Sequence, residues 1–134
     1  MKIVVDTNIL FSFFWENSIT KRLLTMPFLE LISPQIAFEE LKRYSKEIIS
    51  KAKISSERFK QELNKLTSVV KFIEKKEYSD FIEQAKKISP DKDDTEFFAL
   101  CLKYSGFLWS RDSLLKNQNK IKVLSTNDLI EILF

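Results

Sequence analysis

The chain has 134 residues, a mass of 15.8 kDa and a formal net charge of +3. It contains no histidine, one glycine (Gly106) and one cysteine (Cys101). These counts exclude histidine-based catalytic pairs, glycine-rich phosphate-binding loops, intrachain disulfides and thiolate zinc sites. A length of this order fits one sizeable hydrophobic core, so we expect residues 1–134 to form a single domain.

The overall composition is that of an ordinary soluble globular protein, with 44% hydrophobic and 31% charged residues. The apolar start meets Asp6 too soon to form the core of a signal peptide, and no stretch reaches the ~18 uncharged apolar residues of a membrane-spanning helix. Cys101 lies in an apolar run and is interpreted as a buried side chain. We therefore expect a cytoplasmic protein without a membrane segment. The mild positive charge permits a polyanionic partner without requiring one.

Short apolar runs alternate with segments of helical periodicity along the whole chain. The runs rich in Val, Ile or aromatic residues predict strands at residues 3–5, 29–32, 69–73, 107–109 and 121–124. The periodic segments predict helices at residues 8–14, 20–26, 34–44, 55–66, 78–88, 93–104, 113–117 and 126–133. Strands that are apolar throughout and alternate with helices are typical of a parallel sheet covered on both faces. The sequence therefore predicts a three-layer α/β/α fold around five parallel strands.

Two aspartates lie just after the ends of predicted strands. Asp6 comes after the first strand and Asp112 after the fourth. Right-handed crossovers place the carboxyl ends of parallel strands along one edge of the sheet, so both carboxylates are expected there. The alternative for each is an N-cap of the helix that follows it.

Glu40 lies on the apolar side of the predicted helix 34–44. The apolar residues of this helix form one stripe, which consists of Ile36, Ala37, Leu41 and Tyr44. Glu40 projects from within the stripe, whereas Glu39 projects toward solvent. An ionised carboxylate in such a place costs several kcal/mol unless it is paired or coordinates a metal. We therefore expect Glu40 to be either a metal ligand or the ion-pair partner of a nearby Lys or Arg.

A similar distinction applies to the acids before the predicted helix 93–104. Its buried stripe consists of Phe97, Phe98 and Cys101. Asp94 lies on the midline of that stripe, whereas Asp93 and Glu96 are expected to point away. The alternative is a capping box, with Asp91 at the N-cap and Asp94 three residues later.

Four carboxylates gathered at one edge would repel one another and raise their pKa values unless a hard cation lay among them. Mg²⁺ or Mn²⁺ suits such an oxygen-only ligand set. An acidic site that holds metal on a mildly basic protein points to a phosphate-bearing substrate and to hydrolysis of phosphodiester bonds. The four residues are Asp6, Glu40, Asp94 and Asp112, and they make the chain a candidate nuclease.

The short motifs around these acids form an ordered set: IVVDTN at 3–8, FEEL at 38–41, DKDD at 91–94, FFAL at 97–100 and LWSRD at 108–112. Their order and spacing resemble the PIN-domain family of metal-dependent ribonucleases over essentially the whole chain. The resemblance implies a five-stranded parallel sheet and a catalytic metal site at Asp6, Glu40, Asp94 and Asp112. It also implies supporting roles for Asn8 and Ser110, which would orient ligands or the scissile phosphate. Asp91 and Asp93 would act as supplementary ligands.

The same resemblance suggests a biological role. Many small PIN proteins are toxins of toxin–antitoxin pairs, usually homodimers silenced by an antitoxin protein, so an RNA substrate, an antitoxin partner and a homodimer are expected here. Two other functions stay open. One is a non-catalytic PIN-type module that binds RNA or protein. The other is a haloacid-dehalogenase-like phosphatase with Asp6 as nucleophile, although that chemistry wants a second aspartate where this chain has Asn8. DNA is not excluded as substrate.

The lysine-rich region 45–79 matches no motif of the family. One interpretation is a surface that tracks single-stranded RNA, with Tyr44 and Phe59 as stacking positions. Its basic residues would be Lys42, Arg43, Lys46, Lys51, Lys53, Arg58 and Lys60. The favoured interpretation is a solvated helix surface balanced by Glu47, Glu57 and Glu62.

Overall fold

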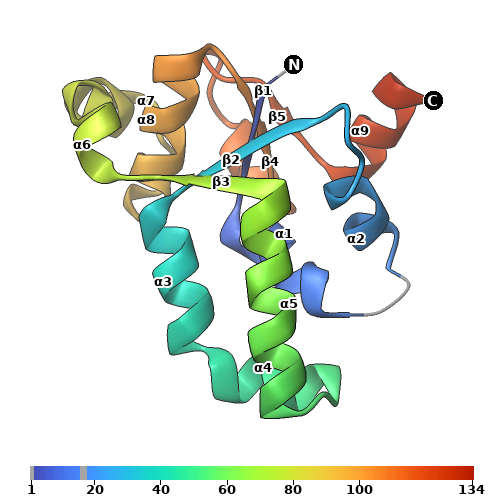
Figure 1. Ribbon diagram of the computed structural model, residues 1–134. Helices are drawn as coiled ribbons and strands as arrows, with labels where there is room; N and C mark the ends of the chain where they lie inside the picture. Colours follow the sequence, from blue (N-terminus) through green and yellow to red (C-terminus); the bar gives the residue numbers. More distant parts are fainter. Residues whose placement is uncertain (1, 16–17) are drawn as a thin grey trace.

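A computed structural model describes residues 2–15 and 18–134, and its centre is a parallel sheet (Figure 1). The strands are β1 (Lys2–Val5), β2 (Glu30–Pro34), β3 (Val70–Ile73), β4 (Phe107–Trp109) and β5 (Val123–Leu124). Their order in the five-stranded sheet is β3-β2-β1-β4-β5, and every neighbouring pair is parallel. The predicted fold class, a five-stranded parallel α/β/α arrangement, is confirmed.

Strand β1 occupies the middle of the sheet. Its Val4 pairs with Ile32 on one side and with Leu108 on the other. The side chains of Ile3, Val4 and Val5 are completely buried, as expected for a strand with helices over both faces. From β1 the chain builds β2 and β3 on one side and then β4 and β5 on the other. The crevice between the ends of β1 and β4 is therefore a topological switch point, where binding sites of open α/β sheets form.

Helices cover both faces of the sheet (Figure 1). The segments between β1 and β3 are α1 (Thr7–Phe11), η1 (Ser12–Phe14), α2 (Ile19–Leu24), α3 (Gln35–Arg43), α4 (Ser45–Ala52) and α5 (Ser56–Val69). Those between β3 and β4 are α6 (Lys75–Tyr78), η2 (Ser79–Phe81), α7 (Ile82–Ile88), η3 (Lys92–Asp94) and α8 (Thr95–Tyr104). The chain continues through η4 (Ser113–Lys116) and, after β5, ends with α9 (Thr126–Leu133). Figure 1 shows α1, α3 and α5 on one side of the sheet and α7 and α8 on the other.

Helix α8 forms the core of its layer. Residues 97–101 are buried, and the helix packs against β1, β2 and β4. Cys101 is fully buried, and burial raises the pKa of its thiol, so the interpretation of this cysteine as a core residue is confirmed. In the part of the chain that the structure describes, no helix combines the length and apolar character needed to cross a membrane.

The structure corrects several predicted helices. The predicted helix 8–14 divides into α1 and the 3-10 turn η1, and the predicted helix 78–88 begins earlier and breaks at η2. Helix α4 was not predicted, because its buried side consists mainly of Ile48 amid Lys, Ser and Glu. Helix α9 has the predicted bounds, and its capping box between Ser125 and Asp128 explains the sharp start.

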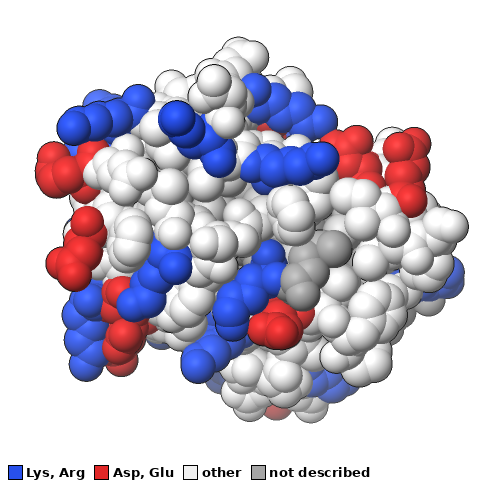
Figure 2. All heavy atoms as spheres, turned by 90° about the horizontal axis from the view of Figure 1, so that it is seen from above, with Lys and Arg blue, Asp and Glu red and all other residues white. Residues whose placement is uncertain are grey.

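The structure corrects one detail of each interpretation of the lysine-rich region 45–79. Phe59 is buried and stacks on Phe14 with ring centroids 5.0 Å apart, so it offers no stacking position to a ligand. Glu62 is 2% exposed and binds Lys21 from α2 at 3.0 Å, so it is a buried ion-pair centre and not a solvated counter-charge. Figure 2 shows the molecule from above, away from α4, and on that face basic and acidic side chains are interspersed.

Candidate metal centre

The ends of β1 and β4 bring Asp6 and Ser110 into contact. Val5 pairs with Trp109 in the sheet, and the Asp6 amide donates to the Trp109 carbonyl at 3.0 Å. The residues that follow this pair, Asp6 and Ser110, are therefore neighbours too. The Ser110 hydroxyl donates to Asp6 Oδ2 at 2.6 Å, and the Asp112 amide donates to Ser110 Oγ at 3.0 Å. Asp6 is only 6% exposed, so this short bond fixes a nearly buried carboxylate.

Helix capping explains the position of Asp112 better than that of Asp6. Asp6 occupies the N-cap position of α1, but its side chain makes no capping hydrogen bond there. Asp112 Oδ1 accepts a hydrogen bond from the Leu114 amide at 3.0 Å, so this carboxylate does cap η4. The nearly buried Asp6 carboxylate therefore requires another reason.

Glu40 lies half-buried on α3, at the edge of a stripe that is narrower than predicted. Ala37 and Leu41 are fully buried, but Ile36 and Tyr44 are 36% and 40% exposed. Burial is the main cause that raises the pKa of Glu40. The positive charge of Arg43 acts in the opposite direction, and the charges of Asp6, Glu96 and Asp93 raise the pKa further.

Asp94 ends η3 and precedes α8 as its N-cap residue, without a capping hydrogen bond from its side chain. The alternative capping box is wrong, because Asp91 Oδ1 accepts from the Asp93 amide at 2.9 Å and caps η3 instead. The pKa of Asp94 is raised to about 7, mainly by burial and further by the nearby charges of Asp6, Asp91, Asp112 and Asp93. Asp91 and Asp93 themselves are exposed.

The charge of Asp6 links the members of this group. Its own pKa is raised by burial and by Asp112, against the lowering effect of the bond from Ser110 and of the first amides of α1. The Asp6 charge in turn raises the pKa values of Glu40 and Asp94. Within residues 2–15 and 18–134, no Lys or Arg lies within ion-pair distance of Asp6, Glu40, Asp94 or Asp112. Negative charge is therefore in excess around Asp6, whose charge acts on those of Glu40, Asp94 and Asp112.

Glu96 was expected to point away from this edge, and that expectation is wrong. It is half-buried and accepts a hydrogen bond of 2.5 Å from the hydroxyl of the fully buried Tyr78. Its charge also raises the pKa of Glu40. The sequence carries no signal for this contact, since Tyr78 belongs to a different helix.

The chemical nature of the candidate ligands suits a hard divalent cation. All candidate ligands are carboxylate oxygens, and burial together with mutual repulsion disfavours their charged forms, which a cation would stabilise. The oxygens do not converge on one point: among the described residues no group of three or more acidic, histidine or cysteine side chains is close enough to hold an ion.

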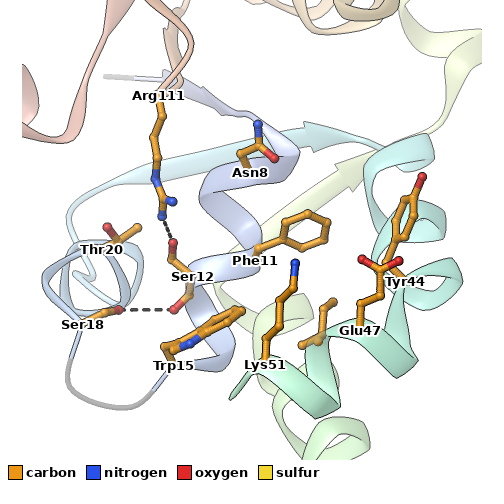
Figure 3. Close-up of a pocket in the computed structure, with 11 residues that line it drawn as sticks. Asn8, Phe11, Ser12, Trp15, Ser18, Thr20, Tyr44, Glu47, Lys51 and Arg111 are labelled. Atoms are coloured by element: carbon orange, nitrogen blue, oxygen red, sulfur yellow. Dashed lines mark hydrogen bonds between the residues drawn. The ribbon is translucent and has the colours of Figure 1, made fainter. Parts of the chain in front are cut away.

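A pocket of about 530 Å³ is lined by residues that are close in sequence to two of the carboxylates (Figure 3). Asn8, two residues after Asp6, is exposed and lines it, as does Arg111, which precedes Asp112. The Arg111 guanidinium donates to Ser12 Oγ. The other lining residues are Phe11, Trp15, Ser18, Thr20, Tyr44, Glu47, Ile48 and Lys51.

The fold and this edge together define a small parallel α/β protein with an acidic site at its topological switch point. The PIN domain family model matches residues 4–128, so the chain belongs to the PIN domain family. Proteins of this family are generally nucleases.

The fold is similar to a chain in the crystal structure of VapBC2 from Rickettsia felis bound to a DNA fragment from their promoter. The TM-score is 0.64 at 16% identity, and the match covers 93% of this chain and 98% of that chain. No curated protein sequence matches significantly.

Proposed function

We propose that this protein is a divalent-metal-dependent endoribonuclease that hydrolyses RNA phosphodiester bonds. Its proposed active site consists of Asp6, Glu40, Asp94 and Asp112. The observation that carries the proposal concerns Asp6, whose carboxylate is nearly buried and interacts electrostatically with the other three acids. Among the described residues, no basic side chain lies within ion-pair distance of these four acids. Membership of a family that consists generally of nucleases supports the same chemistry.

In this proposal the chain's residues have distinct tasks. Asp6 and the other three acids hold Mg²⁺ or Mn²⁺, which when bound activates water and stabilises the leaving oxygen. Ser110 orients Asp6 through its hydrogen bond. Asp94, whose pKa is raised to about 7, changes its charge near neutral pH. Asn8 faces the adjoining pocket and would contact the substrate strand, whereas Asp91 and Asp93 would assist from the exposed rim.

We further propose that the protein is the toxin of a toxin–antitoxin pair, acts as a homodimer in the cytoplasm and is silenced by an antitoxin protein. The similarity to a chain of a VapBC complex supports this role. Co-purification of the chain with the product of a neighbouring gene, with loss of RNA cleavage in the complex, tests it.

The chemistry is tested by incubating the purified chain with single-stranded RNA and with DNA of the same sequence, in Mg²⁺ or Mn²⁺ and in excess chelator. We expect RNA cleavage only with metal, and loss of that cleavage in Asp6→Asn. The matched control is Asp80→Asn, which changes an exposed acid of η2 and should leave activity unchanged. Cleavage that survives both chelation and Asp6→Asn would refute the proposal. Metal-independent RNA binding without turnover on any RNA would favour a binding module.

A further inference from the structure

The pocket lined by Asn8 and Arg111 is placed to receive part of the substrate. Two of its lining residues, Asn8 and Arg111, are close sequence neighbours of Asp6 and Asp112. A strand whose phosphodiester lay at the acidic edge would therefore continue past Asn8 and Arg111 into the pocket. A volume of about 530 Å³ lies within the range of pockets that bind small organic groups.

Aromatic rings form much of the pocket wall. Phe11 from α1, Trp15 after η1 and Tyr44 at the end of α3 all line it (Figure 3). The rings of Phe11 and Tyr44 meet edge to face, at 6.3 Å between centroids and 87° between planes. Tyr44 is 40% exposed and Trp15 is half-buried, so both rings keep accessible surface. Accessible rings of this kind stack on the faces of unpaired bases.

The pocket also carries positive charge. Arg111 lies at its mouth, held by its hydrogen bond to Ser12, and Lys51 projects from α4 (Figure 3). Neither side chain forms an ion pair with an acid within the described residues. Among the residues that the structure describes, Glu47 is the one acid that lines the pocket. Two cations beside aromatic rings complement the phosphates and bases of a single strand better than they complement a segment of ordinary peptide.

We propose that this pocket binds an unpaired base of the substrate next to the cleaved phosphodiester, with the base against Trp15 and Tyr44 and the flanking phosphates near Arg111 and Lys51. The proposal rests on the nuclease function above. It makes the pocket the part of the protein that selects single-stranded substrate, because a base paired in a duplex cannot enter it.

The first test uses the two tryptophans. Trp109 is completely buried, so of the two tryptophans only Trp15 is accessible to a bound base. Asp6→Asn protein in chelator is titrated with a single-stranded oligouridylate of about ten nucleotides, a length that spans one such site. We expect saturable quenching of tryptophan fluorescence, its loss in Trp15→Phe, and no comparable quenching by duplex RNA of the same length. Quenching that persists in Trp15→Phe, or equal quenching by duplex, would overturn the proposal.

The second test measures cleavage of single-stranded RNA by otherwise unaltered protein. Tyr44→Ala and Trp15→Ala should each lower kcat/KM about tenfold, mainly through KM, and Lys51→Ala should act in the same direction. The matched control is Phe28→Ala, which removes an aromatic ring that is 60% exposed outside the pocket and should leave kcat/KM unchanged.

The two tests separate this proposal from the nuclease proposal. Metal-dependent cleavage by the wild type, with full kcat/KM in Tyr44→Ala and Trp15→Ala, would overturn the base pocket and leave the nuclease intact. Absence of cleavage, together with Trp15-dependent quenching by single strands, would refute the nuclease and support the pocket. An antitoxin-derived peptide that quenches Trp15 when no oligonucleotide does would show that the pocket is a protein-binding site and overturn the proposal.

Discussion

The hydroxyl of Ser110 donates a 2.6 Å hydrogen bond to Oδ2 of Asp6, from a residue 104 positions later in the chain. The bond ties the ends of β1 and β4 together and is itself shielded, since Ser110 is 2% exposed. Ser110 also accepts from the amide of Asp112, so one hydroxyl positions two of the four acids. We regard it as the positioning residue of the proposed metal centre.

Ser110→Ala is expected to weaken Mn²⁺ binding and the rate of RNA cleavage by about 10- to 100-fold, because groups that orient metal ligands typically contribute this much. Calorimetric titration with Mn²⁺ measures the affinity directly. Ser113→Ala, which changes an exposed serine of η4, is the control and should bind Mn²⁺ like the wild type. Equal affinity in the two variants would show that Ser110 does not position the ligands.

The metal-free protein should become less stable as pH rises from about 4 to about 7. The pKa of Asp94 is raised to about 7, so in this interval the folded state binds more protons than the unfolded state, whose aspartates titrate near 3.9. The pKa values of Asp6 and Glu40 are raised as well and act in the same direction. Urea denaturation in chelator across this range measures the change in the free energy of unfolding.

Two controls isolate the acidic edge in that experiment. Asp94→Asn should show a smaller loss of stability with rising pH than the wild type. Excess Mg²⁺ should stabilise the wild type more at pH 7 than at pH 5, because the ion competes with protons for the carboxylates. Stability that rises steadily between about pH 4 and 7 in chelator would contradict the raised pKa values. Asp128, with a pKa lowered to about 2, contributes stability that is lost only at lower pH.

Glu62→Gln is expected to reduce the free energy of unfolding by about 1–2 kcal/mol, since hydrogen bonds to a charged group contribute roughly this much. The Glu62 carboxylate is 2% exposed and binds the partly exposed Lys21 at 3.0 Å and Arg58 at 2.9 Å, so the change weakens two charge-assisted contacts at once. Glu57→Gln, on the exposed side of the same helix, should cost less than about 1 kcal/mol. Equal losses in the two variants, measured by urea denaturation, would contradict this assignment.

Gly106→Ala should destabilise the fold by about 1–3 kcal/mol, since overpacking costs this much. A Cβ atom at this position would lie 2.9 Å from the carbonyl oxygen of Lys2, which belongs to the backbone of β1 and cannot move freely. The neighbouring Ser105 has φ 53° at the end of α8, so Ser105→Gly should instead stabilise the protein, by about 0.5 kcal/mol. Thermal unfolding of the two variants should therefore shift in opposite directions, and a shift in the same direction would contradict the account.

The sheet and two of the acids could be predicted from the sequence because their signals are local. Each strand is a short apolar run, and β4 has the predicted bounds. Asp6 follows β1 directly and Asp112 follows β4 closely, and parallel pairing then brings both to one edge. Glu40 and Asp94 were identified from their place on helix faces, and both are half-buried.

The rest depends on contacts that no local pattern contains. Helical rotation placed Tyr44 on the buried side of α3, but the tertiary fold leaves it in the wall of an open pocket. Glu62 was taken for a solvated counter-charge because its partner Lys21 lies 41 residues earlier. Glu96 was expected to face solvent because its contact with Tyr78 joins two helices. Such distant polar pairings follow from the packing of helices on the sheet.

Anomalous X-ray diffraction from crystals of the protein grown with Mn²⁺ tests the central claim most directly. The account predicts an anomalous peak at the carboxyl edge of β1 and β4, with Asp6 and at least two of Glu40, Asp94 and Asp112 as ligands, and its disappearance in Asp6→Asn crystals. A Mn²⁺-saturated crystal with no peak at that edge, or with its ion bound by other residues, would contradict it.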